Sequence, residues 1–280
     1  MRLLFDGAMG TMLYEAGMKS GECSEVFGFK NKEKLLHIHK QYLEAGADII
    51  TANTLCANEL TLEPQGYSVE EIIESSIKVA KEATKEYEKI KNRYVALDVG
   101  PLGKLLEPSG DMTKERAYEI YKRQMIQGEK SGADLILIET MIDLKEAEVS
   151  VKAAKENTNL PVFCTMTFAE HGRSYMGDTP EQMVSVLEAS GVDGLGVNCS
   201  LGPKQILPII KKIQNLSKKI IIVQPNAGLP EIINGKTVYN IDKIEFTNEI
   251  KEFINIGIPV IGGCCGTNPE FIKEISNLLI

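Results

Sequence analysis

The 280-residue sequence predicts an α/β fold in which eight parallel strands close into a (β/α)8 TIM barrel, one domain spanning residues 1–280. Short apolar runs rich in β-branched residues alternate with longer amphipathic segments, which is typical of a parallel sheet covered on both faces. Similar glycine-containing turns end successive helices, and eight strand–helix units fit this chain length. A doubly wound open sheet is the second candidate, but Gly7-Ala8-Met9-Gly10 lacks the G-x-G-x-x-G form.

The predicted elements follow one another in strict alternation. Strands are expected at 3–6, 48–53, 94–99, 135–140, 162–167, 194–199, 220–224 and 260–264. Helices are expected near 33–45, 69–91, 114–131, 143–157, 180–190, 203–215, 242–256 and 269–279. Ser68 fits a capping box, and Thr179 and Asn268 each precede a proline at a first helical position. Glycines just past four helices are predicted left-handed C-caps; they are Gly46, Gly132, Gly191 and Gly257.

The composition describes an ordinary globular protein with 25% charged and 43% hydrophobic residues. A net charge of −8 gives no general attraction to nucleic acid or to anionic membranes, so neither is expected as a partner. We find no apolar run of the ~20 residues that a membrane span needs, and no signal-peptide pattern at the start. Six cysteines do not suggest a disulfide framework, which favours the cytoplasm.

Three cysteines follow predicted strands, namely Cys199 and the adjacent pair Cys264 and Cys265. Three thiols at the ends of two strands can form a zinc site with one open position, at which a fourth thiol becomes a nucleophile. Neighbouring side chains alternate faces in a regular strand, so the pair requires a break in the pleat. We expect the surrounding glycines, Gly262, Gly263 and Gly266, to supply that backbone freedom. On spacing alone, small buried core cysteines remain the other interpretation.

Two carboxylates, Asp6 and Glu139, also lie at predicted strand ends. A carboxylate there needs a partner, either a substrate ammonium or a group of the protein itself. The backbone N–H groups around Gly7 and Ala8 could form a nest for a substrate carboxylate. Together these groups describe an amino-acid pocket. The remaining candidates are weaker: Cys164 is interpreted as core, His171 as an exposed loop residue, and His37 and His39 as helix-surface residues.

The strand-end motifs resemble those of the homocysteine S-methyltransferase family, in particular the homocysteine-binding modules of its cobalamin-dependent members. Eight matching pieces occur in the same order and together span residues 5 to 267. They are Phe5-Asp6-Gly7-Ala8-Met9-Gly10-Thr11-Met12, Tyr42-Leu43-Glu44-Ala45-Gly46-Ala47-Asp48-Ile49-Ile50, Thr51-Ala52-Asn53-Thr54, Gly100-Pro101-Leu102-Gly103, Leu137-Ile138-Glu139-Thr140-Met141, Val197-Asn198-Cys199-Ser200, Pro225-Asn226-Ala227-Gly228-Leu229-Pro230 and Gly262-Gly263-Cys264-Cys265-Gly266-Thr267.

The resemblance implies one zinc ion per chain, held by Cys199, Cys264 and Cys265, with homocysteine sulfur at the open position. It places the substrate amino group on Glu139 with Asp6 nearby, and the substrate carboxylate on the amides around Gly7 and Ala8. Asn198 is expected as a supporting polar contact beside the metal.

The implied reaction is zinc-dependent methyl transfer to the homocysteine thiolate, giving methionine. An aliphatic thiol has a pKa near ~8.5, and zinc coordination deprotonates it. The expected donor is methylcobalamin on a partner corrinoid protein, with a methyltetrahydrofolate-binding methyltransferase module; either these modules are separate proteins or the chain is an excised piece. S-methylmethionine or betaine is the alternative donor, and a non-catalytic thiol- or zinc-binding regulatory subunit is a second alternative. A Schiff-base aldolase is disfavoured because its lysine is missing from the strand ends.

Overall fold

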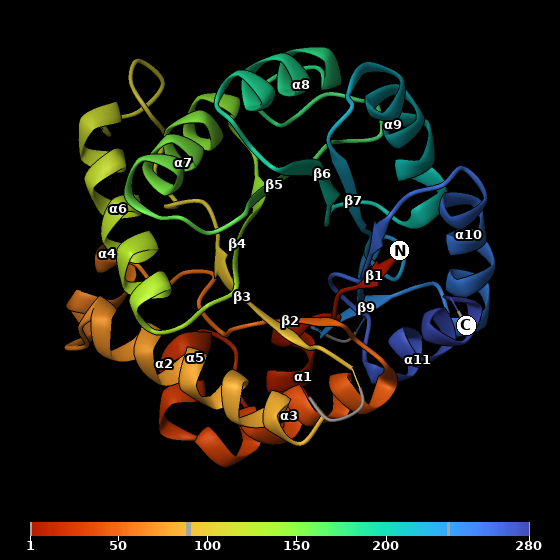
Figure 1. The fold of residues 1–280 in the computed structure, drawn as a ribbon, viewed down its shortest axis with the longest axis horizontal. Helices are drawn as coiled ribbons and strands as arrows, with labels where there is room; N and C mark the ends of the chain where they lie inside the picture. Colours follow the sequence, from red (N-terminus) through yellow and green to blue (C-terminus); the bar gives the residue numbers. More distant parts are fainter. Residues whose placement is uncertain (1, 88–90, 234–235, 280) are drawn as a thin grey trace.

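A computed structural model describes residues 2–87, 91–233 and 236–279, and it shows the predicted barrel: eight parallel strands inside a ring of helices (Figure 1). The strands are hydrogen-bonded in the order β1-β10-β7-β6-β5-β4-β3-β2. Their bounds are β1 Leu3–Leu4, β2 Ile49–Thr51, β3 Tyr94–Val99, β4 Leu135–Met141, β5 Val162–Met166, β6 Gly194–Asn198, β7 Ile220–Gln224 and β10 Val260–Ile261.

The first and second strands complete the ring. A parallel bridge joins Phe5 to Ile49, and the N–H of Asp6 donates to the carbonyl of Ile49 at 3.0 Å. On the other side of this pair, the N–H of Asp48 donates to the carbonyl of Leu4 at 2.7 Å. This closure brings the carboxyl ends of all eight strands to one mouth.

The helices are α1 Met9–Glu15, α2 Ser24–Lys30, α3 Lys32–Ala45, α4 Glu59–Leu62, α5 Val69–Lys85, α6 Lys114–Lys130, α7 Leu144–Asn157, α8 Pro180–Ala189, α9 Pro203–Leu216, α10 Lys243–Asn255 and α11 Pro269–Leu279, with a 3-10 turn at Glu63–Gln65. All eight predicted helices are present. The helix expected at 69–91 ends at Lys85, and residues 88–90 lie outside the described part of the chain. The short helices α1, α2 and α4 were not predicted, since none has a long apolar stripe.

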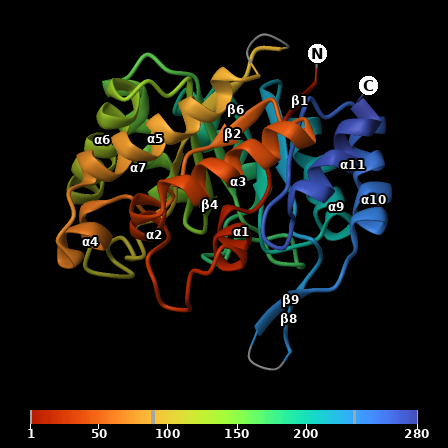
Figure 2. The same ribbon diagram turned by 90° about the horizontal axis from the view of Figure 1, so that it is seen from below.

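A hairpin of β8 (Pro230–Ile233) and β9 (Lys236–Tyr239) follows β7 and was also not predicted. Figure 2 shows it projecting from the barrel at the end where the strands finish. Within the described residues, none of the helices has the length and hydrophobicity needed to cross a bilayer.

The helix ends follow their predicted local signals. The four glycines predicted as C-caps have φ values of 108°, 94°, 87° and 86° at Gly46, Gly132, Gly191 and Gly257. The Ser68 side chain accepts the N–H of Glu71 at 3.2 Å, whereas Thr179 forms the complete reciprocal box. These caps satisfy terminal backbone groups that a helix leaves unpaired.

The hydrophobic core has two layers. Side chains of Phe5, Ile49, Leu137, Ile222 and Val260 fill the barrel interior, and a larger cluster packs the strands against the helices. Strand β6 passes its neighbour so closely that a Cβ on Gly196 would lie 1.8 Å from the carbonyl oxygen of Ile222. That close approach requires glycine.

Candidate metal centre at the barrel mouth

Three thiols converge at the mouth from two loops that are distant in sequence. The sulfurs of Cys199, Cys264 and Cys265 all lie within 4.8 Å of one another, and Sγ of Cys199 is 3.7 Å from Sγ of Cys265. All three residues are partly buried. In the described part of the chain, this is the one group of three or more potential metal-ligating side chains so close together. Three soft sulfur donors match the preferences of zinc.

The backbone turns sharply after β6 to present the first thiol. Cys199 and Ser200 have φ values of 58° and 60°, a left-handed conformation that costs about 1–3 kcal/mol in a residue other than glycine. Hydrogen bonds hold this turn, because the N–H of Cys199 donates to the carbonyl of Gln224 at 3.0 Å and that of Leu201 donates to the carbonyl of Cys199 at 2.7 Å.

The adjacent cysteines lie in a loop rather than in the predicted strand 260–264, because β10 already ends at Ile261. The N–H of Cys264 donates to the carbonyl of Pro225 at 2.8 Å, and the carbonyl of Cys265 accepts from Ala227 at 2.9 Å. These bonds fasten the cysteine loop to the chain that follows β7. Both thiols can therefore face one point without alternating as they would in a strand.

The glycines around this pair act for different reasons than we predicted. Only Gly266 of the three has a positive φ, at 81°. Gly262 and Gly263 are needed for space, since added Cβ atoms would lie 2.7 Å from Cβ of Phe5 and 2.4 Å from Oγ1 of Thr267, respectively. The general expectation of backbone freedom is thus wrong for two of the three positions.

The thiol cluster favours negative charge at one sulfur. Hydrogen bonds from Cys199 and Cys264, with a further one from Tyr239, lower the pKa of Cys265 to about 3. The thiol of Cys264 has its pKa raised through its hydrogen bonds to Cys199 and Cys265 and by burial. A thiolate held beside two more thiols suits a divalent cation, which would displace the remaining protons. The residues present therefore fit zinc.

Asn198 connects the thiol cluster to the irregular carboxyl end of β4, where the strand register shifts between Ile138 and Met141. Its side chain is fully buried; Oδ1 accepts the N–H of Thr140 at 2.8 Å and the hydroxyl of Thr165 at 2.8 Å. Its Nδ2 donates to Oγ1 of Thr140 at 2.8 Å and approaches Sγ of Cys264 at 3.9 Å. Thr140 has a φ of 62°, so Asn198 stabilises a strained backbone position within β4, directly after Glu139.

Three carboxylates lie close to one another in the barrel mouth, and one of them, Glu139, is also close to Cys265. Burial, followed by the charges of Asp6 and Cys265, raises the pKa of Glu139 to about 8. Burial also raises the pKa of Asp98 well above its ordinary value, and the charge of Glu139 is the next largest cause. Oδ1 of Asp98 is buried and has no hydrogen-bond partner among the described residues. This cluster favours a cationic group in the mouth, because a cation would relieve the repulsion.

Asp6 already has a partner within the protein. Its Oδ2 accepts the N–H of Thr51 at 2.8 Å and the Thr51 hydroxyl at 3.1 Å. Burial nevertheless raises its pKa to about 7. Asp6 therefore satisfies the pairing requirement internally, and a direct contact with substrate stays a prediction.

The loop after β1 is packed rather than open. The N–H of Ala8 donates to Oγ1 of Thr267 at 3.3 Å, and the carbonyl of Ala8 accepts the Tyr42 hydroxyl at 3.0 Å. A Cβ on Gly7 would lie 2.7 Å from Oγ1 of Thr267. These contacts place Gly7 and Ala8 next to the cysteine loop, and the predicted carboxylate nest remains a prediction.

The structure corrects one weaker expectation and locates others. His39 is not a surface residue: it is fully buried on the inner face of α3, and burial lowers its pKa to about 3. His37, two residues earlier, is exposed, so the two histidines lie on different faces of the helix. Cys164 lies in the core and His171 is exposed.

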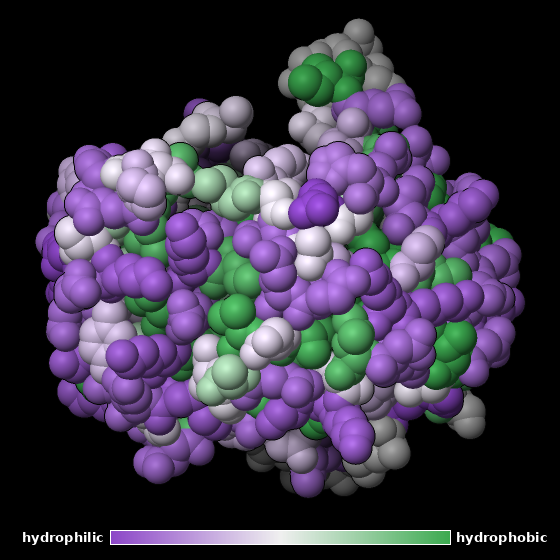
Figure 3. All heavy atoms as spheres, turned by 90° about the horizontal axis from the view of Figure 1, so that it is seen from above, coloured by the Kyte–Doolittle hydropathy of each residue, from purple (hydrophilic) through white to green (hydrophobic). Residues whose placement is uncertain are grey.

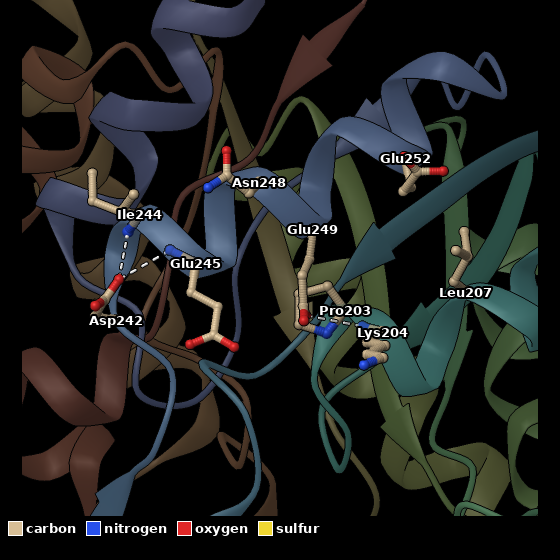
Figure 4. A pocket seen from close by; sticks show the side chains of 9 residues that line it. All are labelled: Pro203, Lys204, Leu207, Asp242, Ile244, Glu245, Asn248, Glu249 and Glu252. Carbon is tan, nitrogen blue, oxygen red and sulfur yellow. Dashed lines mark hydrogen bonds between the residues drawn. The ribbon is translucent and has the colours of Figure 1, made fainter.

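A separate groove lies outside the barrel between α9 and α10 (Figure 4). Two carboxylates that line it form hydrogen bonds to the ends of helices. Asp242 accepts the N–H groups of Ile244 and Glu245, both at 2.9 Å, and Glu249 accepts the N–H group of Lys204 at 3.2 Å. The groove contains none of the strand-end residues, so the mouth remains the candidate site.

The fold and the mouth together define a parallel (β/α)8-barrel protein that presents three cysteine sulfurs beside buried carboxylates. The chain belongs to the homocysteine S-methyltransferase family, which matches residues 3–279. The resemblance seen in the sequence and the methyltransferase class are thereby confirmed at the level of the family.

Two curated relatives are named methionine synthase. That of Mycobacterium leprae (strain TN) is 30% identical over 292 residues, and that of Mycobacterium tuberculosis (strain ATCC 25618 / H37Rv) is 28% identical over 286 residues. Each alignment covers 97% of this chain but only 24% of the relative. The chain thus spans about a quarter of these proteins.

Solved structures of the homocysteine methyltransferase MmuM from Escherichia coli share the fold. Its oxidized form gives a TM-score of 0.85 at 20% identity, covering 99% of this chain and 96% of that one. Its metallated form gives 0.84 at 21% identity, with the same coverage. At this identity, the similarity establishes the architecture.

Proposed function

We propose that this chain binds one zinc ion through Cys199, Cys264 and Cys265 and transfers a methyl group to the thiolate of L-homocysteine, giving methionine. The convergence of three thiols at the barrel mouth carries the proposal, since sulfur ligands suit zinc. When bound, zinc would favour the thiolate form of a sulfur ligand, which is the form that attacks a methyl carbon. In that reaction a sulfur–carbon bond forms, and the bond between the methyl group and its donor breaks.

The residues of the mouth would orient the amino acid. Glu139 would accept the substrate ammonium. Oδ1 of Asp98, which has no hydrogen-bond partner in the described part of the chain, lies in the same carboxylate cluster. The backbone around Gly7 and Ala8 would face the substrate carboxylate. Asn198 would hold Glu139 and the cysteines in fixed relative positions, because it is bonded to Thr140, the residue after Glu139, and approaches Cys264. Holding the reacting groups in a fixed orientation lowers the entropic part of the activation barrier.

The cysteine variants test the metal centre. Cys199→Ser and Cys265→Ser should each lose the bound metal, falling from about one zinc per chain, because the site would keep only two thiolates. Metal content by atomic absorption and homocysteine affinity by calorimetry should fall together. Cys23→Ser is the matched control and should keep both. A zinc-free protein with full activity would refute the proposal.

The methyl donor is a separate question. We propose methylcobalamin on a corrinoid protein or module, with a methyltetrahydrofolate-binding module as its source, because the methionine synthases that the chain resembles are about four times as long as the matched region. The cytoplasm is the proposed compartment, since the thiols must stay reduced.

A donor panel discriminates the candidates. Methionine formation is measured with free methylcobalamin, S-methylmethionine, betaine, and methyltetrahydrofolate plus a corrinoid protein. Turnover with either corrinoid arm supports the proposal, whereas turnover with S-methylmethionine or betaine alone would replace the donor. Zinc binding without turnover in any arm would favour the regulatory subunit.

A further inference from the structure

One buried hydroxyl, that of Thr267, lies where the cysteine loop meets the loop after β1. The side chain of Thr267 is fully buried, and its Oγ1 donates to the carbonyl of Cys264 at 2.7 Å. The same oxygen accepts the N–H of Ala8 at 3.3 Å. Both loops lie at the end of the barrel from which the β8–β9 hairpin projects (Figure 3). The hydroxyl thus joins the backbone of a proposed zinc ligand to the loop that is expected to face the substrate carboxylate.

The bond to Cys264 closes the turn that carries Cys265. The carbonyl of Cys264 accepts both the N–H of Thr267, at 3.1 Å, and its hydroxyl. The third residue of this four-residue turn, Gly266, has a φ of 81°, and a positive φ is what a type II turn requires at that position. Backbone and side chain of Thr267 therefore hold the turn together, and Cys265 lies between the residues that they join.

The neighbouring chain has glycine at two positions where it passes this hydroxyl. An added Cβ would lie 2.7 Å from Oγ1 of Thr267 at Gly7, and 2.4 Å from the same atom at Gly263. The two loops can therefore enclose the hydroxyl only because both positions lack a side chain. A hydroxyl enclosed in this way depends on partners within the protein, since leaving a buried polar group unpaired is costly.

Two further hydroxyls support the same junction. The N–H of Gly266 donates to Oγ1 of Thr11, in α1, at 3.2 Å. From α3, the buried hydroxyl of Tyr42 donates to the carbonyl of Ala8 at 3.0 Å. The N–H and the carbonyl of Ala8 are thus both held by side chains. The cysteine loop and the loop after β1 form one connected unit, with Thr267 bonded to both.

We propose that Thr267 is a positioning residue that couples the metal centre to the amino-acid pocket. Through Cys264 it fixes the turn that presents the cysteine sulfurs, and through Ala8 it fixes the loop expected to face the substrate carboxylate. Hydrogen-bond partners behind metal ligands orient those ligands, and their loss typically weakens metal binding by about 10–100-fold. The inference rests on the proposed zinc and homocysteine sites and deepens them. Thr267 acts through its neighbours and binds neither the metal nor the substrate.

Thr267→Val tests the hydroxyl, because valine has nearly the same shape but neither donates nor accepts a hydrogen bond. Zinc affinity, measured by competition with a chromophoric chelator, should weaken by about 10–100-fold. Homocysteine affinity is then measured by calorimetry on the zinc-saturated proteins. It should fall by about 3–10-fold in the variant, because the N–H of Ala8 loses its partner and the loop is no longer fixed.

Thr267→Ser is the rescue variant, since it keeps the hydroxyl, and both affinities should stay within twofold of wild type. A side chain that only fills space would give the opposite order, with valine better than serine. Thr84→Val is the matched control: Thr84 is also buried, and its hydroxyl donates at 2.9 Å to the carbonyl of Lys81, three residues earlier in α5. Both affinities should be unchanged there. If the valine variant does not fold, Thr267→Ala compared with Thr267→Ser removes the same oxygen from a smaller side chain.

The coupling and the metal centre fail in different ways. Both affinities within twofold of wild type in Thr267→Val would overturn the coupling, as would the loss of only one of them, because each bond would then serve its own loop alone. A serine variant no better than the variant without the hydroxyl would overturn the role of that hydroxyl. A wild-type protein that binds no zinc, or a Cys199→Ser variant that keeps it, would instead overturn the metal centre itself.

Discussion

Three carboxylates of the mouth, each unfavourable as a buried charge, lie close enough to influence one another. Asp6, Asp98 and Glu139 repel one another and all have raised pKa values, chiefly because burial disfavours their charged forms. Asp6 is partly compensated by Thr51, whereas Oδ1 of Asp98 is left without a partner among the described residues. A bound ammonium would compensate this cluster, which explains why carboxylates tolerate burial here.

Glu139→Gln should separate substrate binding from metal binding. We expect homocysteine affinity to fall by at least about tenfold with zinc retained, because a charged partner of the ammonium is lost. Since the pKa of Glu139 is about 8 in the empty pocket, ammonium capture below that pH releases a proton. The affinity of the wild type for homocysteine should therefore rise with pH up to about 8. Measured by calorimetry, the slope of the logarithm of this affinity against pH should be smaller in the variant by about one proton. Glu181→Gln, an exposed change on α8, is the control. An unaltered affinity and slope would remove Glu139 from the pocket.

At the scale of elements, local sequence signals determine where helices begin and end. The glycine C-caps and the N-caps at Ser68 and Thr179 act within one turn, so the pattern could be read directly, although the complete capping box forms at Thr179 rather than at Ser68 as predicted. The cysteine loop was harder to predict because β10 ends at Ile261, three residues earlier than expected. The hairpin and the short helices have no long periodic pattern, and their stability comes from tertiary packing.

Two glycine substitutions test how closely the strands pack. Gly196→Ala should destabilise the protein by about 2–4 kcal/mol, since its Cβ would clash with the carbonyl of Ile222 in β7. Gly10→Ala in α1 should instead stabilise it by about 0.5–1 kcal/mol, because the added Cβ meets no described atom within 4 Å beyond its chain neighbours and its own helix backbone. Urea unfolding monitored by circular dichroism measures both. Equal midpoints for the two variants would contradict this account of β6.

Across the whole molecule, the mouth carboxylates couple stability to pH. Raised pKa values mean that the folded state binds more protons than the unfolded chain. The stabilisation from Asp6 is fully present below its ordinary pKa of 3.8 and is lost as pH rises through about 7. Asp6 therefore contributes least to the folding stability of the substrate-free barrel near and above neutral pH.

Asp6→Asn removes this titration and should gain stability relative to wild type as pH increases. We expect the difference in Tm between variant and wild type to grow by about 2–8 °C between pH 5 and pH 8. Scanning calorimetry of the metal-free proteins measures it. Asp111→Asn, at an exposed position, should show a difference that does not vary with pH; the same constant difference for Asp6→Asn would contradict the assignment.

The sequence by itself determined the barrel, the eight long helices that alternate with its strands, and the placement of Cys199, Cys264 and Cys265 after strands, because periodicity and caps depend on neighbours in the chain. Only the tertiary structure decided that the three sulfurs meet within 4.8 Å, that His39 is buried, and that Asp98 joins the carboxylates. It also placed Asn198 against Cys264. These contacts join segments far apart in the chain, and strand register, barrel closure and loop packing set them rather than any local pattern.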